Sequence, residues 1–192
     1  MKMTVRLGLL ALAIGSALTA THALAAGPGS TAQSAAVTYK DTPWEDLMPK
    51  GWDPLKRYRD ANVGVLNDGS PKVMDMMREM REAWDNAPTN SAMEGAAVRM
   101  PGYVVPLEEA KGALKEFLLV PYFGACIHVP PPPANQIIHV LADKPVKGVR
   151  TMDAVWVSGT LSTFRQESVM GVSGYRMRAA LVVPYTEPVA RP

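Results

Sequence analysis

The stretch YRMRAALVVPY at residues 175–185 decides the fold class of this chain. Its expected buried face consists of Tyr175, Met177, Ala179 and Leu181. Arg176 and Arg178 lie between these apolar residues, and such a period of two is typical of a strand with one buried face. The stretch AVWVSGTLST at 154–163 alternates in the same way, so the second half of the chain is predicted to be β-structure.

Three further strands are predicted upstream of these two, each bounded by Gly, Pro, Asp or Ser. They cover residues 97–107, 116–122 and 136–142. Five short strands without long helices between them favour a small closed barrel, because closure removes exposed sheet edges. We therefore expect a mainly β fold over 93–192, a five-stranded barrel of oligonucleotide-binding-like topology. The alternative is a small open sheet packed under a methionine-rich helix.

A helical arm is predicted at 41–92, ahead of the barrel. Trp44 and Leu47 are spaced to share one face of a short helical turn and to dock on the main body. Ser70 suits the N-cap of a longer helix and Pro71 its first position. This helix should end near 86–88, since the residue before a proline leaves the α region.

The longer predicted helix has an apolar face. Its residues at helical spacing are Val73, Met76, Met77, Met80 and Trp84. Methionine fills gaps in cores readily, so we expect these side chains and Met74 to pack rather than to bind copper(I) through their thioethers.

The first residues predict a cleavable export signal. Lys2 and Arg6 precede an apolar run at 7–18, and the small residues Ala23 and Ala25 suit cleavage after Ala25. The run is shorter than the roughly 20 residues that span a bilayer. We therefore expect a signal peptide at 1–25, a flexible polar leader at 26–40, and a periplasmic protein with no direct membrane insertion after cleavage.

The mature chain has no excess of basic residues. The full sequence has 20 Lys and Arg against 18 Asp and Glu, and the predicted signal removes two of the basic residues. A near-neutral exported protein is not expected to bind nucleic acid.

The segment between the second and third predicted strands carries the candidate chemistry. It holds the only cysteine of the chain, Cys126, together with His128, and His139 follows shortly after. One thiolate and two imidazoles suit zinc, with copper as the alternative, and Asp143 or water could complete the site. Simple packing of a buried Cys126 and of a core His139 is an equally weighted interpretation. Nucleophilic catalysis is the weakest one, because nothing nearby lowers the thiol pKa, and we expect no enzyme.

The same segment also fits a rigid recognition loop that needs no metal. Four consecutive prolines favour a stiff polyproline II conformation, and such segments often dock on partners. The residues of this candidate binding loop are Tyr122, Pro130, Pro131, Pro132, Pro133, Asn135 and Gln136. A dimer linked through Cys126 is a third interpretation.

Several stretches resemble a family of exported bacterial domains of unknown function, number 3299. The matching stretches are WEDLxP at 44–49, GYVVPL at 102–107, FLLVPYFGACIHVPPPPxNQ at 117–136, VWVxGTL at 155–161 and YxM at 175–177. Members of this family look to be encoded beside ABC-type transporter components in zinc-responsive gene sets. The resemblance thus implies a part in metal supply, or an adaptor role for an inner-membrane ABC-type transporter.

Overall fold

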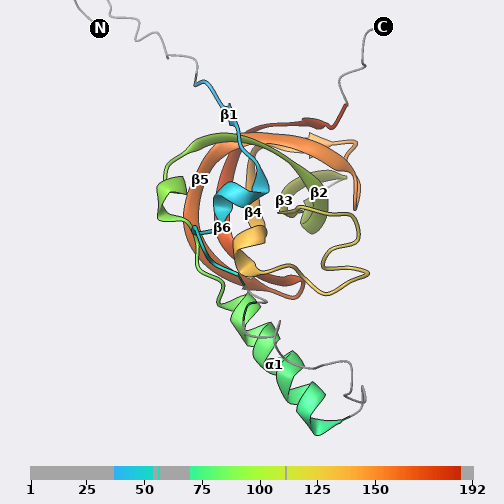
Figure 1. Ribbon diagram of the computed structural model, residues 1–192. Coiled ribbons are helices and arrows are strands. Elements are labelled where there is room, and N and C mark those ends of the chain that lie inside the picture. The colour runs from blue at the N-terminus through green and yellow to red at the C-terminus, as the bar shows by residue number, and fades with distance from the viewer. Residues whose placement is uncertain (1–36, 54–55, 57–69, 111, 187–192) are drawn as a thin grey trace, which may run out of the picture. The chain divides into compact units, whose positions relative to one another are not determined.

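Five long strands form a closed barrel in the computed structural model, which describes residues 37–53, 56, 70–110 and 112–186 (Figure 1). The strands are β2 (Ala97–Ala110), β3 (Ala113–Val120), β4 (Ile138–Lys147), β5 (Ala154–Ser168) and β6 (Gly171–Pro184). The other elements are β1 (Lys40–Asp41), α1 (Pro71–Asp85) and the 3-10 helices η1 (Trp44–Leu47), η4 (Ser91–Met93) and η5 (Ala134–Gln136). The predicted signal peptide and most of the predicted leader lie outside the described residues.

The strand order confirms the predicted barrel. The sheet runs β1-β2-β3-β4-β6-β5, and an additional pairing of β2 with β5 closes it. The β4–β6 pair is parallel, whereas the other pairs of long strands are antiparallel. This is an oligonucleotide-binding-like arrangement with β1 as an outer strand, and the alternative of an open sheet is wrong because β2 and β5 pair.

The main core fills the barrel, as the alternation in 175–185 predicted, with one exception. Tyr175, Met177 and Ala179 are buried, but Leu181 is 53% exposed. The reason is a β-bulge: Ser158 pairs with Leu181 while Gly159 pairs with Ala179, which leaves one extra residue in β6. The extra residue shifts the alternation, so that Leu181 leaves the core side.

The N-terminal part of the arm docks on the barrel as predicted. Leu47 is fully buried in the main core, and Trp44 packs against that core. The hydroxyl of Tyr175 on β6 donates to the carbonyl oxygen of Leu47 at 2.7 Å and accepts from the backbone N–H of Asn90 at 2.6 Å. One buried side chain of the barrel thereby fixes two segments of the arm.

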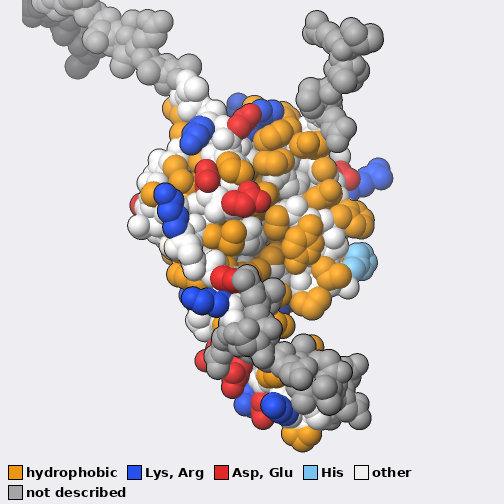
Figure 2. All heavy atoms as spheres, in the orientation of Figure 1, with side chains coloured by type: hydrophobic (Ala, Val, Ile, Leu, Met, Phe, Trp, Pro, Cys, Tyr) orange, Lys and Arg blue, Asp and Glu red, His pale blue; other side chains and the backbone are white. Residues whose placement is uncertain are grey.

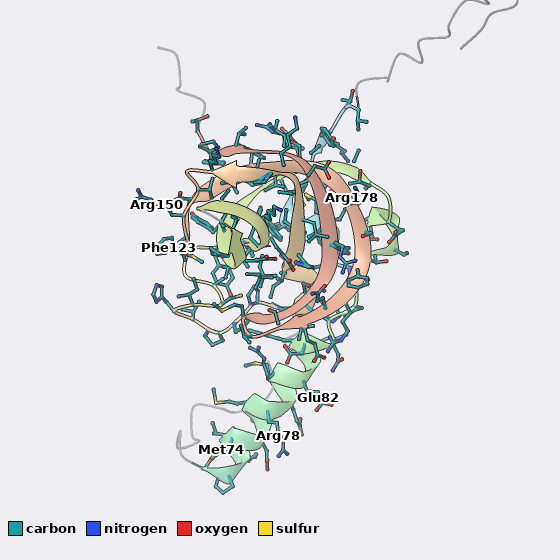
Figure 3. All side chains as sticks on the ribbon, turned by 180° about the vertical axis from the view of Figure 1, so that it is seen from behind. Met74, Arg78, Glu82, Phe123, Arg150 and Arg178 are labelled. Atoms are coloured by element: carbon teal, nitrogen blue, oxygen red, sulfur yellow. The ribbon has the colours of Figure 1, made fainter. Side chains whose placement is uncertain are left out.

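The predicted limits of the long helix are confirmed, but its packing differs from the prediction. Ser70 caps α1 by accepting from the N–H of Val73 at 3.4 Å, and Asn86 is the C-cap. Yet α1 has no fully buried residue, and Met74 and Met77 are more than 60% exposed. The side chains of Met74, Arg78 and Glu82 project from the helix in Figure 3. Among the described residues, the expected core packing of the methionine cluster is therefore only partial.

None of the described helices is both long and apolar enough to cross a membrane.

Candidate functional site

A second, smaller core holds the connection between β3 and β4 against the outside of the barrel. Val105 and Leu118 are register partners on β2 and β3, and they alternate with residues of the main core, so they point to the opposite face of the sheet. They form a buried cluster with Ala125 and Ile137 from the connection, and Met152 from the β4–β5 turn joins it. The connection is thus seated on an apolar platform.

The first part of this connection is a tightly closed loop, residues 121–129, which we name the apolar loop. The carbonyl oxygen of Gly124 accepts from the N–H groups of Ile127, His128 and Val129 at 3.2, 2.8 and 3.2 Å. The N–H of Gly124 in turn lies 3.1 Å from the sulfur of Met152. Because one glycine organises so many contacts, the loop has a defined shape.

The apolar loop presents large apolar side chains to solvent. Tyr122, Phe123, Ile127 and Val129 are 42, 65, 37 and 45% exposed. Hydrophobic side chains cover much of the side of the barrel on which this connection lies (Figure 2), and Phe123 points outward in Figure 3. Clustered exposed apolar residues are typical of interaction surfaces. Sequence analysis did not identify Phe123, Ile127 and Val129, although the absence of any charged residue from 117 to 142 was the signal that could have found them.

Cys126 occupies a strained position in this loop. Its φ is 67°, a left-handed conformation that non-glycine residues rarely adopt. The side chain is half-buried and lines a cleft of about 460 Å³ together with Arg81 and Arg165. Burial raises the pKa of the Cys126 thiol to about 11, against the smaller opposing effect of Arg81. The thiol is therefore protonated at neutral pH and is a poor nucleophile.

The three predicted metal ligands lie in different environments. Cys126 and His128 share the apolar loop, where His128 is exposed. His139 lies on β4, is 2% exposed, and its Nε2 is 2.6 Å from Oε1 of Glu116 on β3. Asp143, the suggested fourth ligand, is exposed and lies 3.8 Å from a guanidinium nitrogen of Arg178. In the described part of the chain, no three His, Cys, Asp or Glu side chains are grouped so that they could hold a metal ion.

The proline run packs against the barrel rather than standing free. Pro132 is buried and Pro131 and Pro133 are half-buried, while Pro130 is exposed. The run leads into η5, which adds Ala134 to a third small apolar cluster. Most of the predicted polyproline surface is therefore occupied by the protein itself.

The two polar residues after the prolines tie this segment to the arm. The side-chain amide of Asn135 donates to the carbonyl oxygen of Pro88 at 2.8 Å, and that of Gln136 donates to the carbonyl oxygen of Trp44 at 3.0 Å. Asn135 is fully buried. Both residues, predicted to belong to a binding loop, thus stabilise the junction between the barrel and the arm.

Fold and site together define a small OB-like β-barrel protein that carries a rigid apolar loop on its outer surface. The chain belongs to the family described as Protein of unknown function (DUF3299), whose model matches residues 44–184. The crystal structure of a DUF3299 family protein from Pseudomonas aeruginosa PAO1 is similar, with a TM-score of 0.61 and 35% sequence identity over 79% of this chain and 99% of that chain. Comparison with curated proteins gave no match.

Proposed function

We propose that this protein is a periplasmic, non-enzymatic binding module, and that the apolar loop is its recognition surface for a membrane transporter. The observation that carries the proposal is the exposure of Tyr122, Phe123, Ile127 and Val129 on one uncharged loop. A folded domain gains no stability from leaving such side chains in water, whereas a partner that covers them gains apolar contact area. The periplasmic location and the transporter come from the export pattern and the family resemblance.

The rigidity of the loop supports a binding role. Binding a flexible loop costs conformational entropy, which subtracts from affinity. The three hydrogen bonds to the Gly124 carbonyl oxygen and the packing on Val105 and Leu118 lower that cost before a partner binds. An apolar surface held in one shape is the kind of surface that supplies the central contacts of a protein interface.

The state of the one thiol argues against cysteine-based catalysis, the one enzymatic mechanism that the sequence suggested. A nucleophilic cysteine needs a lowered pKa and a base within hydrogen-bond reach. Burial instead raises the pKa of Cys126, and the Nε2 of the buried His139 lies against Glu116.

The zinc function suggested by the sequence stays a prediction. Cys126 and His128 are two donors on one loop, and zinc sites in proteins take at least three protein ligands. Further ligands would have to come from outside the described residues. Since only a thiolate binds zinc, the raised thiol pKa also adds a cost to binding at neutral pH.

Site-specific photocrosslinking in living cells tests the binding role. A photoreactive phenylalanine analogue placed at position 123 should crosslink to a transporter component. The matched control is the same analogue at Phe164, which is 41% exposed and lies on β5. Equal crosslinking from both positions, or none from position 123, would contradict the proposal. The double variant Ile127→Ser and Val129→Ser should abolish the crosslink from position 123 with only a small change in melting temperature, because both side chains are more than a third exposed.

A further inference from the structure

A separate groove of about 290 Å³ lies beside the apolar loop. Three aromatic side chains, Trp44, Tyr103 and Tyr185, line it together with Pro101 and Pro121. No side chain that lines it carries a charge. Its walls come from η1, β2, the first residue of the apolar loop, the first residue of β5 and the segment that follows β6, so residues far apart in sequence build it.

Each aromatic wall of the groove is held in place by a contact of its own. The indole N–H of Trp44 donates to the carbonyl oxygen of Pro101 at 2.8 Å. The ring of Tyr185 stacks on Trp156, with 5.4 Å between ring centroids and an angle of 24° between ring planes. Tyr103 makes an edge-to-face contact with Phe123 of the apolar loop at 5.8 Å. The groove is therefore preorganised, which lowers the entropic cost of binding.

The groove offers two tyrosine hydroxyls as hydrogen-bonding groups. Among the described residues, neither the Tyr103 hydroxyl nor the Tyr185 hydroxyl is hydrogen-bonded, and both can donate to a carbonyl oxygen. The Trp44 N–H is already used. A ligand that fits this groove is uncharged, stacks on aromatic rings, offers carbonyl acceptors and brings few donors of its own.

We propose that this groove binds a proline-containing extended segment of a partner protein. Proline lacks a backbone N–H, its ring packs on aromatic faces, and the polyproline II conformation leaves its carbonyl groups free to accept. Grooves lined by aromatic residues are the known way to recognise such segments. A sugar fits less well, because its many hydroxyl groups need several polar partners, and the two tyrosine hydroxyls are the only side-chain polar groups that this described lining leaves unpaired.

The ligand is a segment of another protein rather than the proline run of a second copy. Pro131, Pro132 and Pro133 are at least half-buried against their own barrel, which leaves only Pro130 exposed. The groove is continuous with the apolar loop through the contact between Tyr103 and Phe123. A partner that covers the loop can thus place an extended segment in the groove.

Calorimetric titration of the purified protein with decaproline tests this inference, with a Gly/Ser peptide of the same length as the ligand control. We expect saturable binding of decaproline only. Tyr103→Ala and Tyr185→Ala should each weaken it about tenfold or more, as loss of an aromatic contact at the centre of a site does. Tyr103→Phe and Tyr185→Phe keep the rings and should weaken it only a few-fold. Thermal unfolding of each variant verifies folding.

Two further variants separate this inference from the proposed function. Phe164→Ala removes an exposed aromatic residue outside the groove lining and should leave decaproline binding unchanged. The double variant Ile127→Ser and Val129→Ser should abolish crosslinking to the transporter but keep decaproline binding. The inference is overturned if decaproline gives no saturable heat, if both tyrosine-to-alanine variants bind it as well as the wild type, or if a neutral disaccharide shows the same tyrosine dependence instead.

Discussion

The hydroxyl of Tyr175 joins the arm to the barrel, and Tyr175→Phe removes that hydroxyl alone. Tyr175 is fully buried, and its hydroxyl bonds to the carbonyl oxygen of Leu47 at 2.7 Å and to the N–H of Asn90 at 2.6 Å. A net hydrogen bond contributes about 0.5–1.5 kcal/mol, and a buried group left without a partner costs about 1–3 kcal/mol. Here the Asn90 N–H also lies 3.2 Å from the Leu47 carbonyl oxygen, so both backbone groups keep a partner in the variant. We therefore expect a loss of about 1.5–2.5 kcal/mol in the free energy of unfolding.

Urea unfolding followed by tryptophan fluorescence measures this loss as a lower midpoint with an unchanged slope. Tyr185→Phe is the matched control, since this tyrosine is 38% exposed and its hydroxyl has no hydrogen-bond partner among the described residues. The control should stay within about 0.5 kcal/mol of the wild type. A loss below about 0.5 kcal/mol in Tyr175→Phe would refute the two-bond geometry, and a loss above about 4 kcal/mol would show that more than the hydroxyl had changed.

Three more outcomes follow from the structure. Because the folded Cys126 thiol has a pKa of about 11 against an ordinary value near 9, the unfolded thiol loses its proton first, and the free energy of unfolding should fall between those pH values. For Cys126→Ser, the free energy of unfolding measured in urea should fall less across this pH range. A fall identical to that of the wild type would contradict the burial of the thiol. Gly159→Ala should destabilise the barrel by about 1–3 kcal/mol in the same assay, because the new methyl group would overlap the carbonyl oxygen of Arg178. A loss in the free energy of unfolding below about 0.5 kcal/mol would argue against the bulge. Mass spectrometry of the dialysed protein should find less than one zinc per chain, since His128 and Cys126 supply only two of the at least three ligands that a zinc site takes. Stoichiometric zinc that is lost in Cys126→Ser would overturn this expectation.

The strands of the barrel could be predicted because their buried face repeats every second residue. The five predicted strands match β2 to β6 within a few residues at most ends, and Ser70 and Asn86 mark the limits of α1 as expected. The bulge that exposes Leu181 could not be predicted, because it depends on the pairing of β6 with Gly159 across the sheet. Alternation along one strand contains no information on such a register shift.

The candidate site was only partly predictable for a related reason. Sequence reasoning drew attention to the segment that forms the apolar loop, since Cys126 and the proline run are unusual residues in one short window. It grouped His139 with Cys126 because they are close in sequence, whereas the Nε2 of His139 is 2.6 Å from Glu116 on the neighbouring strand. It also could not find the aromatic groove, whose wall residues Trp44 and Tyr185 are brought together only by the closed barrel.

The stretch at 117–136, on which the family resemblance was based, contains residues with three structural roles. Phe117 and Leu119 fill the barrel, and Leu118 and Ala125 form the platform under the apolar loop. Gln136 then donates to the carbonyl oxygen of Trp44 and so holds one wall of the groove. These contacts account for these residues by folding alone.

The exposed residues of the same stretch require a different explanation. Phe123 is 65% exposed and Val129 is 45% exposed, so neither gains much burial from folding. The same loop holds a left-handed conformation at Cys126, which costs about 1–3 kcal/mol and persists because the surrounding structure enforces it. The loop therefore holds apolar side chains in water, in one fixed shape, at a cost in stability. Only a partner that covers these side chains offsets this cost. The strain at Cys126 and the exposure of Phe123 therefore both favour a recognition surface over a structural connection.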